Sequence, residues 1–295
     1  MSGWLWAIFT VLAAGGQTFR NAMQKELIAT LGTVGATHVR FLFGLPFAVL
    51  FLSLIILVSG LRPPPITLVS LAWTTLGALT QIGATALLLA AMRERSFIVT
   101  IALSKTEPVH VALLGLIFLG DHLTMLLAVA ILIATAGVMM MSWPKQDTPM
   151  SWESAALGIG SGALFGLAAI GFRGGIKALD TDSFVIAATT ILVLGLVIQS
   201  LTLSAYLLIR DKDKLFAIFR AWRPSMTAGF MGAFASQMWF LAFALESAAK
   251  VRTLALVEIL FAQLLTRQVF KQKLASREAI GIGLMILGVI VLLNS

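Results

Sequence analysis

Long apolar runs recur along the chain and limit what it can fold into. A helix rises about 1.5 Å per residue, so roughly 20 apolar residues cross the ~30 Å hydrocarbon layer of a membrane. The segments of this length are 4–22, 34–58, 66–91, 97–119, 123–142, 152–172, 183–209, 224–245, 251–270 and 277–294. They lack the two-residue alternation of barrel strands. The sequence therefore predicts an all-α integral membrane protein with about ten transmembrane helices.

Composition and charge agree with this fold class. Only 12% of the 295 residues are charged, whereas an average soluble domain carries about 25%. The net charge is +8, but the cations fall in short clusters between apolar runs. Such clusters suit anionic lipid headgroups better than a continuous groove for phosphates. We expect the lipid bilayer to be a partner and nucleic acid not to be one.

A weak internal repeat divides the chain into two copies. At an offset of 151 residues, Glu107 lies over Glu258 and Gly44 over Gly195. The copies are residues 1–147 and 148–295, with five spans each, and we expect them to form one intertwined membrane domain. Because five is odd, the second copy enters the membrane from the opposite side. Inverted repeats of this kind are characteristic of secondary transporters.

Short motifs resemble those of a known family. Residues 103–109 (LSKTEPV) and 118–123 (FLGDHL), together with Arg40-Phe41, are similar to motifs of EamA-type permeases in the drug/metabolite transporter superfamily. The resemblance implies a ten-helix exporter of amino acids or related metabolites. It also implies a multi-pass protein of the cell membrane, such as a bacterial inner membrane, with both termini in the cytoplasm.

The charges of the loops oppose that orientation. Loops after odd-numbered spans hold fourteen Lys and Arg residues, and the loops on the other face hold five. The positive-inside rule would place both termini outside the cytoplasm. An even number of spans fixes only that the termini share a side, so the orientation stays open.

Two acidic residues lie about halfway along matching spans. Ionisable side chains inside a membrane cost about 2.5–3.5 kcal/mol on insertion scales and mark a pathway or a buried partner. Glu107 and Glu258 are therefore predicted to bind a proton or a cationic group of the substrate. The alternative is a hydrogen-bonded structural carboxylate that joins helices. For Glu258, whose surroundings disfavour a charged carboxyl, we expect proton coupling.

Other ionisable residues have more than one interpretation. Lys105 lies about 200° around the helix from Glu107, so it requires another partner, a cavity or a path to the interface. His110 follows Glu107 by one turn and is a candidate to bond to it, as a structural partner rather than a proton relay. For Arg40, anchoring at the membrane interface is favoured over substrate binding. His38 is also expected at the interface.

Polar and aromatic side chains in three spans complete the candidate site. They are Gln17 in the first span, Trp73, Gly77, Gln81 and Thr85 on one face of the third, and Gln237 and Trp239 in the eighth. A buried amide beside a tryptophan is typical of a small-molecule pocket. An interfacial belt or a helix–helix contact would use the same residues, and both alternatives stay open.

Glycines and prolines predict where helices approach and bend. A stripe of glycines in the sixth span indicates close packing rather than ligand binding: Gly158, Gly162 and Gly166. Pro46 and Pro108 should kink their spans. Ile259 stands where a proline would mirror Pro108, so the fourth span should break at a Pro108 hinge and the ninth should not.

The motifs exclude several function classes. The sequence has neither His-Glu-x-x-His nor Gly-x-Ser-x-Gly, and its three histidines lack metal-ligand spacing. We therefore predict a non-enzymatic secondary transporter without cofactor or metal, acting as a monomer or weak dimer. It would export small organic metabolites, with amino acids and aromatic ones among them favoured, and a proton is a candidate coupling ion. A flippase for lipids or lipid-linked sugars is the alternative, followed by a membrane-embedded lipid-modifying enzyme.

Overall fold

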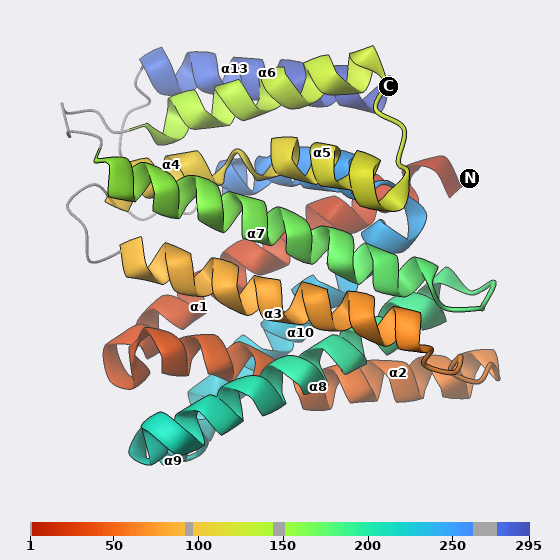
Figure 1. Ribbon diagram of the computed structural model, residues 1–295, viewed down its shortest axis with the longest axis vertical. Coiled ribbons are helices and arrows are strands. Elements are labelled where there is room, and N and C mark those ends of the chain that lie inside the picture. The colour runs from red at the N-terminus through yellow and green to blue at the C-terminus, as the bar shows by residue number, and fades with distance from the viewer. Residues whose placement is uncertain (1, 92–96, 144–150, 262–275) are drawn as a thin grey trace. The chain divides into compact units, whose positions relative to one another are not determined.

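A computed structural model of the protein describes residues 2–91, 97–143, 151–261 and 276–295 (Figure 1). Within these ranges every regular element is a helix. The longer elements are α1 (Leu5–Leu42), α2 (Leu45–Ser59), α3 (Leu68–Ala91), α4 (Phe97–Ser104), α5 (Glu107–Leu119), α6 (Met125–Ser142), α7 (Trp152–Lys177), α8 (Phe184–Arg210), α9 (Lys212–Arg220), α10 (Trp222–Leu245), α11 (Ala248–Leu254) and α13 (Ser276–Leu293). Two short 3₁₀ helices cover Ser2–Trp4 and Ala255–Val257.

Eight helical segments of the described chain are long and apolar enough to cross a membrane. They correspond to the predicted second to eighth spans and to the tenth. The predicted first span, 4–22, lies inside α1, and the predicted ninth, 251–270, runs into residues 262–275, outside the described ranges. The protein is thus all-α in the part described and embedded in a membrane. The number of ten crossings stays a prediction.

Glycine and proline interrupt the first two spans. Gly32 has a positive φ of 67° inside α1, which only glycine adopts without strain, and the helix kinks there. α1 ends at Leu42 and α2 begins at Leu45 with Pro46 in its first turn, so the predicted break at Pro46 is confirmed.

The described chain divides into two compact units. Unit 1 comprises residues 1–79 and 171–245, and unit 2 comprises residues 80–170 and 246–295. Each unit therefore contains parts of both predicted sequence copies, and α3 and α7 contribute to both units. The assignment of the two copies as inverted repeats stays a prediction.

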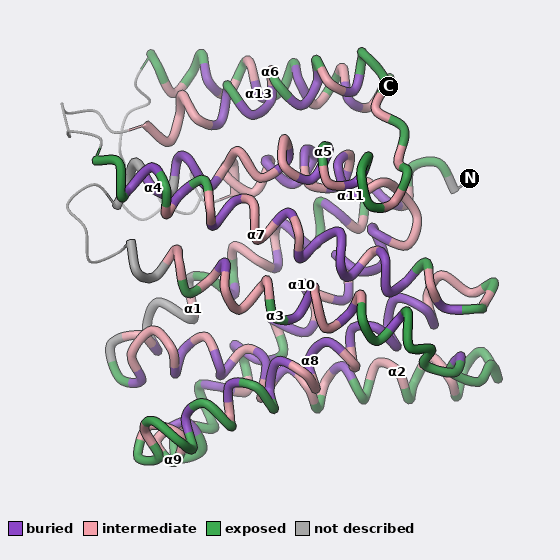
Figure 2. Tube along the Cα trace, viewed as in Figure 1, coloured by how far each residue is buried: buried purple, intermediate pink, exposed green. Residues whose placement is uncertain are grey.

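Unit 1 is built around the contact of α1 with α10, to which α8 and α2 are added. Many residues of α8 and α10 are buried, on the sides that face the other helices of this unit (Figure 2). His38 is fully buried there, and its Nε2 lies 2.9 Å from the Ser204 hydroxyl of α8. α8 covers His38 within unit 1, and the expected position of His38 at the membrane interface stays a prediction.

In unit 2, α6 and α13 pack side by side (Figure 1). Gly137 and Gly288, which the 151-residue offset pairs, both lie in this contact. A Cβ at Gly137 would be 2.6 Å from the Gly281 carbonyl oxygen, and one at Gly288 would be 2.5 Å from the Ala134 backbone nitrogen. The two backbones therefore approach each other more closely than any side chain would permit.

Gly288→Ala should destabilise the protein because the added methyl group meets backbone that has no room to move. Overpacking of this kind costs about 1–3 kcal/mol. Gly283→Ala on the same helix is the control, since nothing lies within 4 Å of a Cβ there; the higher helix propensity of alanine should leave it neutral or stabilised. Thermal unfolding in detergent measures both. Equal melting temperatures for the two variants would contradict the packing.

Candidate functional site

Four charged side chains meet in unit 2. Lys105 Nζ forms an ion pair with Glu258 Oε1, and Arg252 Nε lies 3.0 Å from Glu107 Oε1. The four side chains are 12–24% exposed, and Lys105 and Glu107 interact with all the others electrostatically. We call Lys105, Glu107, Arg252 and Glu258 the charge cluster. In their ionised forms their charges sum to zero.

The pairing in the charge cluster is reciprocal. Each acid pairs with the cation that precedes the other acid in sequence: Lys105 with Glu258, and Arg252 with Glu107. Pairing within one segment would be less direct, because Arg252 lies about 9 Å along the axis from Glu258. Glu258 is therefore the partner that Lys105 was predicted to require.

Both acids follow an interruption in their helix. A turn at residues 105–106 separates α4 from α5, which begins at Glu107, and the 3₁₀ helix Ala255–Val257 directly precedes Glu258. The described residues of the ninth span stay helical through this 3₁₀ turn, and the expected hinge at Pro108 stays a prediction. A 3₁₀ turn keeps near-helical dihedral angles and requires no proline, so Ile259 does not prevent the interruption.

The interruption at Pro108 is packed against α7. Proline has no N–H, so it cannot bond to the carbonyl of Ser104 four residues earlier. That carbonyl lies against Gly162, where a Cβ would be 2.9 Å from the oxygen. Gly158 and Gly166 make similar contacts one turn to either side, and the predicted packing role of the stripe is confirmed.

Ion pairs stabilise both carboxylates, and a helix end adds to this at Glu107. Glu107 is in the first turn of α5, where the helix dipole favours negative charge. A buried ion pair gains little over apolar packing, but removal of one partner leaves a charge uncompensated. The charge cluster therefore holds its helices together as long as all four groups keep their charges.

The sequence made His110 a candidate to bond to Glu107, but its ring contacts the backbone instead. Its Nδ1 lies 3.1 Å from the backbone carbonyl oxygen of Thr106, within the same turn. This contact caps the turn at 105–106 and fixes the imidazole ring at the edge of the interruption. His110 is thus a structural neighbour of the charge cluster.

A second set of predicted residues meets in unit 1. Trp239 Nε1 donates a hydrogen bond to Gln17 Oε1 at 3.2 Å, which joins α10 to α1. Gln237 Nε2 donates to Thr189 Oγ1 at 2.8 Å, which joins α10 to α8. The side chains of Gln237 and Trp239 are each only 5% exposed. These groups are electrically neutral, so the contacts of this set are hydrogen bonds without ion pairing.

Aromatic rings surround that second set. The rings of Trp239 and Phe243 stack with centroids 6.3 Å apart, and those of Phe172 and Phe240 lie 4.7 Å apart. Arg173 Nη1 donates to the Phe243 carbonyl oxygen at 2.9 Å. The buried centre of unit 1 thus combines amides, an indole N–H, aromatic faces and a guanidinium.

The remaining candidates lie apart from these two sets. Arg40 is in the last turn of α1 with its guanidinium 4.4 Å from the Phe41 ring centroid. Gln81 accepts a hydrogen bond from the Thr85 hydroxyl through its backbone oxygen. Trp73 packs against Gly174 of α7. This contact agrees with the alternative in which Trp73 takes part in helix–helix packing.

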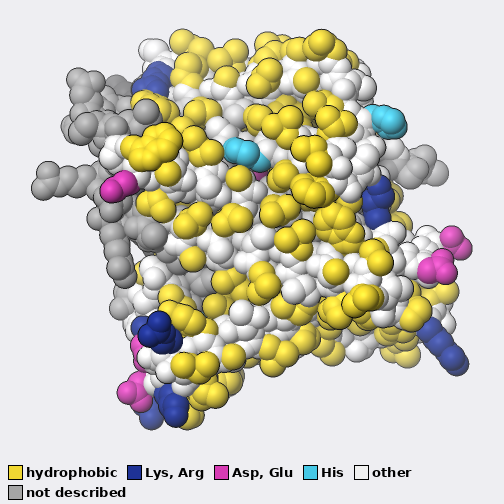
Figure 3. Space-filling view, in the orientation of Figure 1, with side chains coloured by type: hydrophobic (Ala, Val, Ile, Leu, Met, Phe, Trp, Pro, Cys, Tyr) yellow, Lys and Arg dark blue, Asp and Glu magenta, His cyan; other side chains and the backbone are white. Residues whose placement is uncertain are grey.

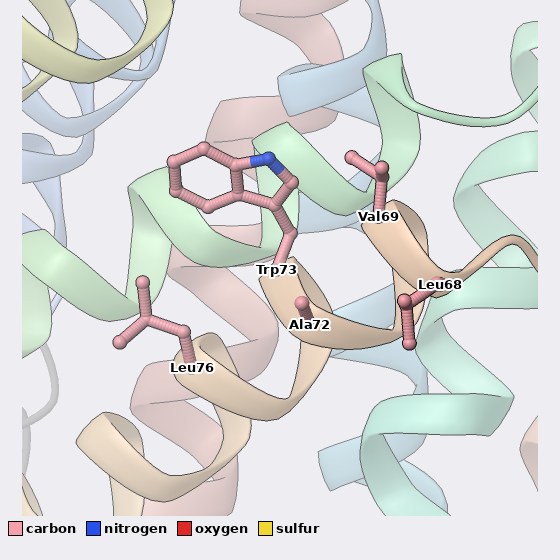
Figure 4. A pocket seen from close by; sticks show the side chains of 5 residues that line it. All are labelled: Leu68, Val69, Ala72, Trp73 and Leu76. Carbon is pink, nitrogen blue, oxygen red and sulfur yellow. The ribbon is translucent and has the colours of Figure 1, made fainter.

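An apolar groove runs along the start of α3. It has a volume of about 470 Å³ and is lined by Leu68, Val69, Ala72, Trp73 and Leu76 (Figure 4). Leu68 is 82% exposed, as a side chain facing lipid would be. The groove lacks the polar groups that orient a metabolite, so it suits acyl chains.

Sequence reasoning missed Arg252 and Thr189 as members of these sets. Arg252 is one of the five Lys and Arg residues that the sequence places in the loops of the second face. The repeat could have indicated its role. If Glu258 pairs with a cation of the first copy, the matching acid Glu107 is expected to pair with a cation of the second copy. Thr189 carries no such signal, because threonines are common in apolar helices.

Comparison with known proteins identifies a fold but not a family. No protein-family model matches the chain, and neither does any curated protein. Twenty-seven chains of solved structures match it in three dimensions. One, described only as the crystal structure of a protein, has a TM-score of 0.73 and 10% sequence identity, covering 98% of this chain and 94% of its own. At that identity the likeness shows the fold alone.

Lys105→Met should lower the free energy of unfolding by about 3 kcal/mol or more, because it leaves Glu258 buried without its cation. Adding Glu258→Leu should recover most of the loss, since two apolar partners leave no charge behind. Unfolding titrations in mixed micelles give the coupling energy. Lys214→Met is the control: its pair with Asp211 is exposed, and we expect a loss below about 1 kcal/mol. Additive losses in the double variant would rule out coupling.

Proposed function

We propose that the protein is a secondary transporter that exports small organic metabolites by alternating access, with amino acids as the favoured substrates. The observation that carries this proposal is the charge cluster, in which two interrupted helices pair their charges with each other. Interrupted helices with ionisable groups line the substrate and ion sites of many transporters. The resemblance to EamA-type permeases supports the same class and a location in the cell membrane, such as a bacterial inner membrane.

Protonation gives the charge cluster a means of switching. When Glu258 takes up a proton it becomes neutral and no longer attracts Lys105, so the two segments separate at lower cost. Release of the proton restores the ion pair. A ligand shifts a two-state equilibrium only by its differential affinity for the two states, and here the proton would supply that difference. The proton gradient is therefore the proposed driving force.

Unit 1 supplies the features that favour amino acids. Gln17, Gln237 and Thr189 offer neutral hydrogen-bonding groups, and Trp239 with Phe243 offers aromatic faces. Aromatic side chains of a substrate stack on such faces with a gain of about 0.5–1.5 kcal/mol beyond the area that they bury. Aromatic amino acids are therefore the first substrates to test.

A flippase for lipids or lipid-linked sugars is the second candidate. The apolar groove on α3 favours it, because that groove accommodates an acyl chain (Figure 4). The deciding experiment is efflux from proteoliposomes loaded with a panel of radiolabelled amino acids and organic acids, with lipid translocation and lipid turnover measured in parallel. Metabolite flux without movement or turnover of lipid would support the transporter; lipid movement alone would overturn it.

Glu258→Gln should abolish pH-driven transport and spare substrate binding, because the amide keeps the shape of the carboxyl but cannot ionise. Uptake driven by an imposed pH gradient and binding by scintillation proximity measure the two effects. Glu153→Gln, at the exposed start of α7, is the matched control and should transport like the wild type. Wild-type pH dependence in Glu258→Gln at normal expression would reject the coupling role and leave Glu258 a structural acid.

A further inference from the structure

A short amphipathic helix lies outside all the candidate spans of unit 1. α9 (Lys212–Arg220) connects α8, which ends at Arg210, to α10, which begins at Trp222. Both neighbours are long and apolar enough to cross a membrane. Because α9 begins two residues after one such helix and ends two residues before the next, it lies at the surface of the bilayer.

The inner face of α9 fixes its position. Ile218 is fully buried and belongs to a core cluster with Leu27, Leu31 and Leu207, against which Leu215 also packs. Gly35 of α1 leaves room for Ile218 and for the stem of Lys214. The helix is therefore held against the region of α1 around its kink and cannot turn over.

The outer face of α9 exposes aromatic rings. Phe216 is 58% exposed and Phe219 is 52% exposed, and Trp222 just beyond the helix is 52% exposed. Aromatic residues gather at the membrane interface, where the ring meets the acyl chains and the polar headgroups at once. Phe216 and Phe219 lie outside the candidate spans, and Trp222 is the first residue of the next one, so the three rings gather at the end of a span, where contact with lipid headgroups is expected.

Cations alternate with those rings. Arg210, Lys212, Arg220 and Arg223 are all exposed, and charged side chains gather over α9 beside hydrophobic ones (Figure 3). The Arg223 guanidinium lies 5.5 Å from the Trp222 ring centroid. Asp213 is the one acid of the helix itself, so this surface keeps an excess of positive charge.

The remaining cation of the segment has its own partner. Lys214 Nζ lies 2.8 Å from Asp211 Oδ2, and the Asp211 carboxyl also accepts a hydrogen bond from the Lys214 backbone N–H. The hydrogen bonds from Lys214 lower the pKa of Asp211, so this acid stays ionised at neutral pH. Asp211 therefore compensates Lys214 and caps α9, and it leaves the other four cations available.

We propose that α9 with its flanking residues is an interfacial site for anionic phospholipid headgroups. Phe216, Phe219 and Trp222 enter the boundary of the acyl chains, and the four exposed cations bind lipid phosphates. Each Lys or Arg near an anionic leaflet adds about 1 kcal/mol of attraction in general, and amphipathic helices combine that attraction with apolar burial. The site is independent of the transport proposal.

Depth in the bilayer is the first test. The chain has no cysteine, so Phe216→Cys, Phe219→Cys and Asp213→Cys can each carry one fluorophore. In vesicles of brominated phosphatidylcholine with 30% phosphatidylglycerol, quenching at positions 216 and 219 should be at least twofold stronger than at 213. Equal quenching at the three positions would overturn the proposed orientation of α9.

Selectivity for anionic lipid is the second test. Phosphatidylglycerol added to protein in neutral detergent should raise the melting temperature more than phosphatidylcholine does. The double variant Arg220→Gln/Arg223→Gln should lose at least half of that difference. The matched double variant Arg62→Gln/Lys177→Gln changes two other exposed cations of unit 1 and should keep it. An equal loss in both doubles, no loss in either, or an equal response to inorganic phosphate would overturn the lipid site.

Discussion

The cost of placing charge inside a membrane governs the arrangement of unit 2. Two glutamates and two cations lie in apolar helical segments, and any one of them alone would be expensive to keep ionised there. Arg252 lies about 9 Å along the axis from Glu258, so pairing within its own segment would be less direct. The pairs therefore form between segments, Lys105 with Glu258 and Arg252 with Glu107. This crossed pairing fixes the two interrupted helices to each other at the level of both interruptions.

Small residues make that arrangement possible. In lipid the apolar side chains gain little from facing each other, so helix association depends on close backbone contact and on polar groups. Gly162 lets α7 approach the Ser104 carbonyl, and the Gly137 and Gly288 contacts bring α6 and α13 together in the same unit. The charge cluster thus lies among helices whose separations are fixed by backbone contacts, which leaves its side chains as the adjustable part.

Local features of the sequence predicted much of this structure. Eight apolar spans, the break at Pro46 and the glycine stripe follow from hydropathy and from the properties of single residues. The partner of Lys105 did not follow, because it lies 153 residues away and such pairs have no periodic signature. The 3₁₀ turn before Glu258 was missed because no proline or glycine marks it. The burial of His38 against α8 was not predicted, because distance from the end of an apolar run does not show which helix covers a residue.

The two units differ in how they would respond to protons, and this difference bears on the proposed mechanism. In unit 1 the bonds of Trp239 to Gln17 and of Gln237 to Thr189 join neutral groups, and they do not change as a carboxyl titrates. The pairs of unit 2 do change, because each loses its attraction when its acid is neutralised. Under the proposed function, recognition would therefore belong to unit 1 and proton coupling to unit 2.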